Sequence, residues 1–329
     1  MSQYRLGITI GDPAGVGPEI VCRALAELRA DERAACVVFG SLEILERANR
    51  LCMTDLSFTI GGSTSPANEV QVRDIASPGI SSVAPGRVSE AAGAAAYANV
   101  VAAVEAALAG DVHAIVTAPL NKAALNAAGH KFSGHTELLA HLCRRQRSYM
   151  LLASERLATI HVSTHVSLAE AVRRVGKQRI LETIEVGNAH LRQMGFERPR
   201  IAVAGLNPHC GEGGLFGNED IEHIEPAVRA AKESGVDASG PIPADSVFLR
   251  AVQGEFDLVV AQYHDQGHIP CKLIAFESTV NVTLGLPIAR TSVDHGTAFD
   301  IAWKGIARHK NMLSAIAYAR RIAQGKRGT

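Results

Sequence analysis

Short apolar runs alternate with longer segments of helical periodicity along this whole chain, and this pattern limits its fold more than any other feature. Runs rich in Val, Ile and Ala are typical of strands that are buried on both faces. Because helix-length segments separate the runs, neighbouring strands are expected to be joined by crossover helices. The alternation therefore predicts an α/β fold with layers around a largely parallel sheet.

The expected strands are residues 6–10, 36–39, 113–117, 150–153, 158–162, 200–204, 257–261 and 280–284. The expected helices are residues 18–28, 42–49, an alanine-rich segment from about Ser89, 177–193, 221–234 and 312–324. Residues 61–85 are rich in Gly, Ser and Pro, so we interpret them as strand fragments and loops.

Length, charge and cysteine content exclude several classes of protein. A chain of 329 residues predicts two domains. Its 33 basic and 33 acidic residues cancel, so no global field favours nucleic acid or an anionic membrane. Six cysteines without a CxxC pair disfavour a disulfide framework or a thiolate zinc site, and the N-terminal residues lack the apolar core of a signal peptide. We expect a cytoplasmic protein.

Residues 91–110 are nearly apolar over the length of a membrane span. Most of them are alanine, however, and Asn99 and Glu105 lie among them. Alanine contributes little to membrane insertion but is the best helix former. We expect a buried helix of a soluble domain and no membrane segment.

Polar residues follow the ends of the expected strands, where open α/β sheets bind their ligands. The first such segment, GDPAGVGPE at residues 11–19, has glycines that let backbone approach a ligand and a proline that suits the first turn of a helix. It has neither the Walker sequence nor GxGxxG, so an ordinary tight turn is an equal alternative. Farther along, His135 and Thr136 open a helix as an anion cradle would, although a capping Thr beside a surface His explains them equally well.

Three histidines share a position just after an expected strand: His165, His209 and His264. Imidazole is a common ligand of divalent metals, and three of them leave a coordination position open for a substrate. Their separations match no local zinc motif, so a hydrogen-bonded loop histidine is the alternative for each. Asp245 and Asp265 are placed to orient such ligands or to move a proton, but aspartate is also common in turns and caps.

Another polar group surrounds the apolar segment VNVTLGLP: Lys272, Asn281, Arg290, Asp294 and His295. Lys and Arg suit a phosphate or a carboxylate, with surface salt bridges as the alternative.

Taken in order, several segments resemble the 4-hydroxythreonine-4-phosphate dehydrogenase family across nearly the whole chain: GDPAGVGPE, TAPLNKAAL, SGHTELLA, GLNPHCGEGGLFGNE, PADSVF, YHDQGH and NVTLGLPIARTSVDHGTAFDIAWKG. The resemblance implies the two-domain α/β/α fold of the isocitrate and isopropylmalate dehydrogenases, with the active site in the interdomain cleft. It also implies a homodimer whose active site takes residues from both subunits. We expect a cofactor-side domain of residues 1–130 plus 280–329, and a metal, substrate and dimerisation domain of residues 131–279.

The resemblance also assigns residues to roles. The implied metal ligands are His165, His209 and His264, the last reaching a site built mainly by the partner chain. The implied substrate-binding residues are His135, Thr136, Lys272, Asn281 and Arg290. The implied cofactor-binding residues are Gly11, Asp12, Gly15, Gly17, Asp294, His295, Gly296, Thr297 and Ala298. Asp245, Asp265 and Lys122 are unranked candidates for the proton relay.

The reaction implied is oxidation of a secondary alcohol β to a carboxylate by NAD or NADP, followed by decarboxylation of the β-keto acid. A divalent ion that binds the reacting oxygen would lower the pKa of the alcohol and stabilise the enolate. Zinc is the first choice for imidazole ligands, with cobalt, nickel, manganese or magnesium as alternatives.

One segment departs from the vitamin B6 (pyridoxal phosphate) biosynthesis branch of the family. That branch has a Thr-Thr-His-Leu-Pro type of sequence, whereas this chain has Ser163-Thr164-His165-Val166-Ser167. This segment is more similar to the branch that oxidises 4-phospho-D-threonate or 4-phospho-D-erythronate in threonate and erythronate catabolism. We expect the chain to belong to that branch. The alternatives are 4-hydroxythreonine-4-phosphate dehydrogenase, an aromatic dihydrodiol dehydrogenase, and a non-catalytic ligand sensor, which the intact histidines disfavour.

Overall fold

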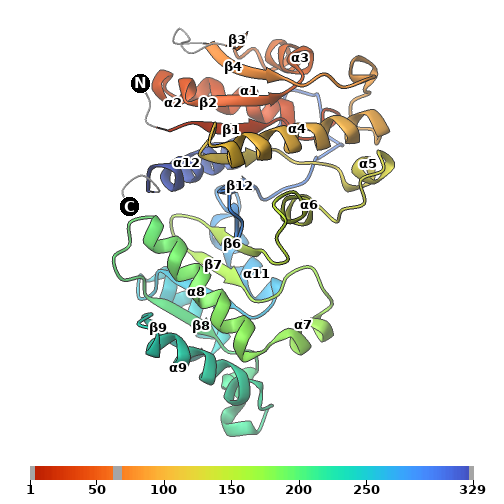
Figure 1. Ribbon diagram of the computed structural model, residues 1–329. Helices are drawn as coiled ribbons and strands as arrows, with labels where there is room; N and C mark the ends of the chain where they lie inside the picture. The colour runs from red at the N-terminus through yellow and green to blue at the C-terminus, as the bar shows by residue number, and fades with distance from the viewer. Residues whose placement is uncertain (1–3, 62–68, 326–329) are drawn as a thin grey trace. The chain divides into compact units, whose positions relative to one another are not determined.

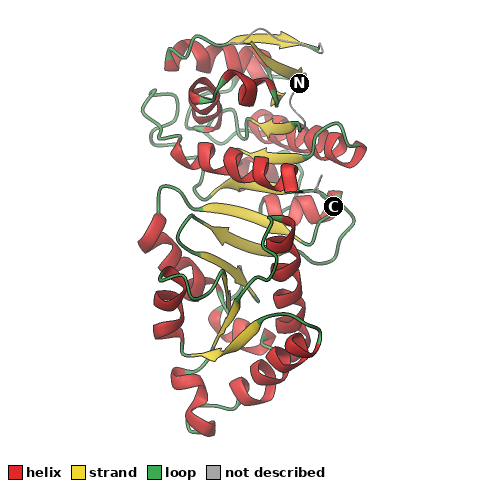
Figure 2. Cartoon of the chain, turned by 90° about the vertical axis from the view of Figure 1, so that its left-hand side faces the viewer, coloured by secondary structure: helices red, strands yellow, loops and turns green. Residues whose placement is uncertain are grey.

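A computed structural model describes residues 4–61 and 69–325 of the chain. Contacts divide the chain into two compact units, unit 1 (Met1–Ser148 with Leu286–Thr329) and unit 2 (Tyr149–Gly285). In each unit, helices cover both faces of a sheet (Figures 1 and 2). Of the segment 61–85, residues 62–68 lie outside the described part, and the rest contains strand β4 and a 3-10 turn at Ile80–Ser82.

Unit 1 has a parallel sheet in the order β3-β4-β2-β1-β5-β12. Its strands are β1 (Leu6–Thr9), β2 (Cys36–Gly40), β3 (Ser57–Ile60), β4 (Glu69–Asp74), β5 (Ala114–Thr117) and β12 (Arg290–Val293). Its helices are α1 (Gly17–Glu27), α2 (Ala30–Ala34), α3 (Leu42–Cys52), α4 (Glu90–Ala109), α5 (Lys122–Ala127), α6 (His135–Leu142) and α12 (Lys310–Gly325).

Unit 2 has a mixed sheet in the order β11-β6-β7-β10-β8-β9, in which β6 is antiparallel to both of its neighbours. Its strands are β6 (Tyr149–Ala153), β7 (Ala158–His161), β8 (Ile201–Ala204), β9 (Ala238–Ile242), β10 (Leu258–Ala261) and β11 (Val280–Leu284). Its helices are α7 (Leu168–Arg174), α8 (Lys177–Gln193), α9 (Glu225–Glu233), α10 (Ala244–Val252) and α11 (His264–Ala275), with a π-helical turn at Asp220–Ile224 before α9. The connection from β6 to β7 is too short for a crossover, so these strands form a hairpin.

The alanine-rich helix α4 belongs to the core of unit 1. By length and composition it could cross a membrane, but half of its apolar window is buried inside the unit. A Cβ at Gly93 would lie 1.9 Å from the carbonyl oxygen of Ala124, so the glycine lets α4 approach α5 closely. Such close packing along its length is that of a core helix.

Helix α6 also belongs to unit 1. Its side chains Leu138 and Leu139 are completely buried in a cluster with Val37 and Phe39 of β2. Residues 131–148 therefore fold with the unit that contains β1, and not with residues 149–279, beside which the sequence analysis placed them.

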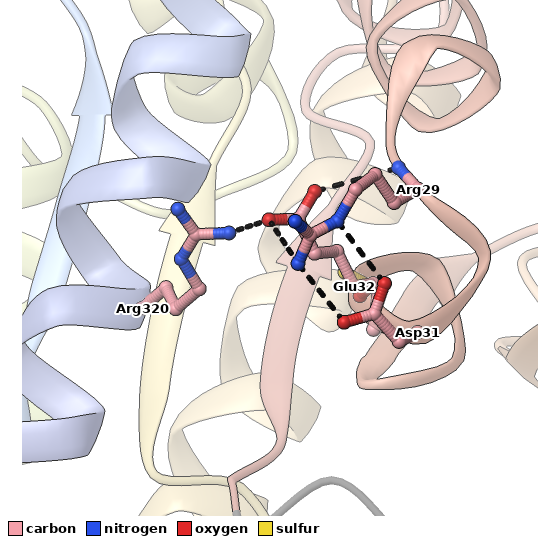
Figure 3. Close-up of polar contacts among 5 residues, drawn as sticks. Arg29, Asp31, Glu32 and Arg320 are labelled. Carbon is pink, nitrogen blue, oxygen red and sulfur yellow. Dashed lines mark hydrogen bonds and ion pairs between the residues drawn. The ribbon is translucent and has the colours of Figure 1, made fainter.

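An ion-pair network ties the last helix to the beginning of unit 1 (Figure 3). Arg320 of α12 pairs with Glu32 of α2, and Arg29 lies 3.6 Å from the same carboxylate. Arg29 also pairs with Asp31 at 3.0 Å.

Candidate active site

The glycine-rich segment 11–19 connects β1 to α1 in unit 1. Gly11 has φ +70°, and a Cβ there would lie 2.2 Å from the carbonyl oxygen of Pro119. At Gly17, a Cβ would lie 2.1 Å from the carbonyl oxygen of Ile10. These two glycines are required because the loop packs against the protein's own backbone, which the Asp12 amide also joins by donating to the Pro119 carbonyl at 2.8 Å.

Asp12 is a completely buried carboxyl group within this segment. Its Oδ1 accepts a hydrogen bond from the Ala14 amide at 2.8 Å. Burial raises the pKa of Asp12 to about 6, against the opposing effect of the Ala14 and Asn121 amides. A carboxyl group that titrates near pH 6 is therefore built into the loop.

The segment 294–305 packs directly on this loop. The Val16 amide donates to the Thr297 carbonyl at 3.0 Å, and a Cβ at Gly15 would lie 2.9 Å from the Thr297 Cβ. The Trp303 indole donates to the Pro13 carbonyl at 2.9 Å. The structure thus brings together the two segments that the sequence analysis associated with the cofactor, with Thr297 buried and with His295 and Gly296 exposed.

Arg290 and His135 form a polar pair in unit 1. Arg290, the first residue of β12, is buried and donates from Nη2 to Thr117 Oγ1 at 2.7 Å. Burial lowers its pKa to about 9. Burial and then the charge of Arg290 lower the pKa of His135 well below its ordinary value, and within the described chain the buried Nε2 of His135 has no hydrogen-bond partner. A guanidinium beside an unpartnered ring nitrogen suits an anionic ligand.

Lys122 and Thr136 lie near the start of α6. Lys122 is exposed at the first position of α5, which Asn121 caps by accepting a hydrogen bond from the Ala124 amide at 3.0 Å. Its Cε would lie 3.6 Å from a Cβ at Gly134, the residue that precedes α6. Thr136 is half-buried in the first turn of that helix.

In unit 2, His165 and His264 follow the neighbouring parallel strands β7 and β10. Their ring centroids are 5.8 Å apart. The Nδ1 of His264 lies 2.6 Å from Asp265 Oδ1, and this hydrogen bond lowers the pKa of Asp265. Engagement of Nδ1 by a carboxylate leaves Nε2 of His264 for a metal or a substrate.

His209 lies on a loop of unusual backbone conformation after β8. Residues 209–213 all have positive φ, from +46° to +83°, and three of them are not glycine. The buried Asp220 accepts hydrogen bonds from the Leu206 amide at 2.9 Å, the Asn207 amide at 3.1 Å and the Asn207 side chain at 3.0 Å. Within residues 4–61 and 69–325, His209 does not join His165 and His264 in a group of three potential metal ligands.

Two buried histidines that were not predicted as site residues, His161 and His268, lie next to His264. The ring of His268 stacks on that of His264 at 3.6 Å, and its Nδ1 lies 3.2 Å from Nε2 of His161. Burial lowers the pKa of His161 to about 4 and that of His268 to about 3. The spacing of His264 and His268 by four residues on one helix is the sequence signal that could have shown this contact.

The remaining predicted site residues of unit 2 lie on three different elements. Asp245 is exposed in the first turn of α10, and its charge adds to burial and Asp220 in raising the pKa of Cys210, next to His209. Lys272 lies on α11, with its ammonium 5.9 Å from the Phe276 ring. Asn281 is half-buried on β11.

Comparison with known proteins gives matches over almost the whole chain. Residues 32–319 match the family of the pyridoxal phosphate biosynthetic protein PdxA. The D-threonate 4-phosphate dehydrogenase of Pectobacterium atrosepticum is 44% identical, with 97% of this chain and 99% of that protein covered. The 4-hydroxythreonine-4-phosphate dehydrogenase of Beijerinckia indica is also 44% identical, with 98% and 96% covered.

Solved structures agree with these matches. A 4-hydroxythreonine-4-phosphate dehydrogenase from Klebsiella pneumoniae is 46% identical, with a TM-score of 0.89 over 98% of this chain and 100% of that one. A β-decarboxylating dehydrogenase from Thermococcus kodakarensis, 12% identical with a TM-score of 0.51 over 98% and 85% of the two chains, shares the fold alone. The predicted α/β class and its likeness to the β-decarboxylating dehydrogenases are thereby confirmed.

Proposed function

Because the chain belongs to the family of the pyridoxal phosphate biosynthetic protein PdxA and is an oxidoreductase that acts on a CH–OH group, we propose that it oxidises 4-phospho-D-threonate or 4-phospho-D-erythronate. The C3 alcohol would pass its hydride to NAD or NADP, and the resulting β-keto acid would lose CO2. Relatives named for D-threonate 4-phosphate and for 4-hydroxythreonine-4-phosphate both reach 44% identity. The substrate choice therefore rests on the segment 163–167, Ser-Thr-His-Val-Ser. The second candidate is 4-hydroxythreonine 4-phosphate, which the same identities support.

Arg290 and His135 support recognition of an anionic substrate. Arg290 as a whole is 3% exposed, so a bound phosphate or carboxylate would meet its guanidinium with little competition from water. His135 remains neutral because of burial and the nearby charge, and a neutral ring nitrogen can donate one hydrogen bond to the same anion. Lys272, Asn281 and Thr136 complete the proposed set of substrate residues.

The donor chemistry in unit 2 fits a divalent ion such as zinc, since His165 and His264 lie close together and Asp265 engages the second ring nitrogen of His264. The chain by itself does not gather a third ligand beside these two within the described residues. We therefore propose a site that two chains complete, with His165, His209 and His264 as its ligands and His264 reaching a site built mainly by the partner chain. When bound, such an ion would polarise the reacting oxygen of the substrate.

An exposed apolar stripe supports the homodimer. Ile269 and Leu273 of α11 and Phe276, its C-cap residue, follow one another at helical spacing and are 56%, 82% and 70% exposed. Helix α10 packs on the same buried hydrophobic cluster of unit 2 as α11. Its residue Leu249 is 61% exposed. Exposed large apolar side chains on neighbouring turns of a helix mark an interaction site, and a second copy of the chain is the proposed occupant. Leu273→Glu should then give a monomer in analytical ultracentrifugation and abolish turnover.

We place the enzyme in the cytoplasm, because all six cysteines are free thiols and five of them are buried.

Steady-state assays with the purified enzyme test the proposed substrate. Turnover of 4-phospho-D-threonate or 4-phospho-D-erythronate should exceed that of 4-hydroxythreonine 4-phosphate, and unphosphorylated D-erythronate should react poorly. Arg290→Ala should lower kcat/KM for the phosphorylated acid by an amount equivalent to about 2 to 5 kcal/mol, and Arg290→Lys should restore only part of it. Equal turnover of the phosphorylated and unphosphorylated acids would contradict the proposal.

A further inference from the structure

One buried carboxylate joins the two segments of unit 1 that are proposed to line the cofactor. Glu19, in the first turn of α1, is completely buried. Its Oε1 accepts a hydrogen bond from the Trp303 amide at 2.5 Å, and its Oε2 accepts one from the Gly305 amide at 2.8 Å. The two carboxylate oxygens thus bind Trp303 and Gly305, which lie more than 280 positions after Glu19 in the sequence.

Other contacts converge on the same place. Arg23 of α1 donates to the Gly305 carbonyl, and the Trp303 indole donates to the Pro13 carbonyl at 2.9 Å. The Arg47 guanidinium lies 4.2 Å from the centre of the indole ring. Helix α1 and its preceding loop therefore hold this end of segment 294–305 through backbone groups as well as the Trp303 side chain.

Trp303 has φ +59°, a left-handed conformation that side-chain-bearing residues rarely adopt. Such a conformation persists only where the surroundings impose it. The hydrogen bonds from the Glu19 carboxylate engage the amides of Trp303 and of Gly305, which has φ +69°. Removal of the carboxylate should release both amides and allow the segment to relax.

We propose that Glu19 is a positioning residue of the coenzyme site, which fixes segment 294–305 against segment 11–19 before the coenzyme binds. This inference rests on the proposed dehydrogenase function. A segment that is already fixed loses little conformational freedom when the coenzyme binds, so the free energy of binding is more favourable. Loss of Glu19 should weaken coenzyme binding and leave turnover at saturating coenzyme nearly unchanged.

The test uses Glu19→Gln, since glutamine keeps the shape but replaces one acceptor oxygen with a donor. NAD and NADP binding are measured by calorimetry, and kcat is measured at saturating coenzyme. Trp303 is the single tryptophan of the chain, so its fluorescence also reports the segment directly in the coenzyme-free protein. We expect the Kd to rise at least tenfold, kcat to stay within about twofold, and the Trp303 emission to shift.

Glu27→Gln is the matched control. Glu27 lies on the same helix and pairs with His309 Nε2 at 2.5 Å, beyond segment 294–305. This variant should bind coenzyme as the wild type does. A second test, Arg23→Met, removes the contact to the Gly305 carbonyl but leaves the Glu19 carboxylate in place. It should weaken binding in the same direction but by less, which keeps the inference testable if Glu19→Gln does not fold.

Wild-type affinity in folded Glu19→Gln, or in Arg23→Met if the first variant does not fold, would overturn the positioning role while the dehydrogenase function stands. A wild-type enzyme that binds neither NAD nor NADP would instead remove the proposed function, and the inference with it.

Discussion

Two aspartates are completely buried but have different surroundings: Asp12 lies in a loop of unit 1, and Asp220 begins the π-helical turn of unit 2. Asp220 accepts three hydrogen bonds, from two backbone amides and the side chain of Asn207. Asp12 interacts with the Ala14 and Asn121 amides, but its buried Oδ2 has no hydrogen-bond partner among the described residues, and burial raises its pKa to about 6. Both carboxylates are completely buried, so they differ in pairing: both oxygens of Asp220 accept hydrogen bonds, whereas one buried oxygen of Asp12 accepts none, which is costly for an ionised carboxylate.

The two loops also differ in how they are held. Asp220 lies 13 residues after Asn207 and keeps a left-handed turn in place through contacts within one stretch of chain. Loop 11–19 is instead held by residues from distant parts of the sequence, through Pro119, Thr297 and Trp303. The contacts of Asp220 are therefore local, whereas the loop of unit 1 depends on residues that are distant in the sequence.

The largest expected effect comes from Asp220→Ala, which leaves the half-buried amides of Leu206 and Asn207 without their acceptor and the Asn207 side chain with Glu219 alone. We expect the free energy of unfolding to fall by about 4 kcal/mol, since each unsatisfied buried donor costs about 1 to 3 kcal/mol. Urea denaturation of unit 2 measures it. In the control Glu219→Ala, which loses one bond to Asn207 at 2.7 Å, the loss should stay below about 1.5 kcal/mol. Equal losses in the two variants would mean that Asp220 has no special role.

Asp12→Asn should change the free energy of unfolding by a smaller amount, and this change should depend on pH. Burial raises the pKa of the folded-state carboxyl from 3.8 to about 6, so the folded protein favours the protonated form. The stabilisation from this proton is complete below pH 4 and is lost as the pH rises through 6. Asparagine keeps an acceptor for the Ala14 amide and does not titrate.

Relative to the wild type, the Asp12→Asn variant should therefore gain about 2 kcal/mol of unfolding free energy between pH 4 and pH 7. Parallel urea titrations of both proteins at pH 4.5, 5.5 and 7 follow the difference. A stability difference that stays constant over this range would show that the Asp12 carboxylate is ionised at a lower pH than its burial implies.

The sequence predicted those elements whose hydrophobic pattern is strong. Helix α8 was predicted at residues 177–193 and is found at Lys177–Gln193. Strand β12 was missed because its sequence, RTSV, is polar although every residue is buried, and Thr291 satisfies its hydroxyl by donating to the Ala315 carbonyl at 2.9 Å. Strand β9 was missed because Gly240 and Pro241 lie inside it, which an edge strand tolerates.

The candidate site was predictable to the extent that its residues follow strands. His165 and His264 both follow expected strands, and their rings lie 5.8 Å apart because β7 and β10 are parallel neighbours. The contacts of Glu19 with Trp303 could not be predicted, since no local pattern links residues so far apart. The antiparallel position of β6 could have been predicted from its short connection to β7.

The ion pair between Glu32 and Arg320 is more exposed to water than Asp12 or Asp220. Its loss should have the smallest effect on the free energy of unfolding. Its side chain is 15% exposed and that of Arg320, its partner on α12, is 31% exposed, so water screens the pair more than it does Asp12 or Asp220 (Figure 3). Arg320→Ala should lower the free energy of unfolding of unit 1 by less than about 1 kcal/mol, and the loss should shrink as salt is added. Urea denaturation at two salt concentrations measures this loss, with Glu32→Ala and the double variant completing a mutant cycle.

Because Arg29 also contacts Glu32, at 3.6 Å, Glu32→Ala should lower the free energy of unfolding more than Arg320→Ala does. A coupling energy of several kcal/mol between Arg320 and Glu32 would instead show that the network behaves as a buried one.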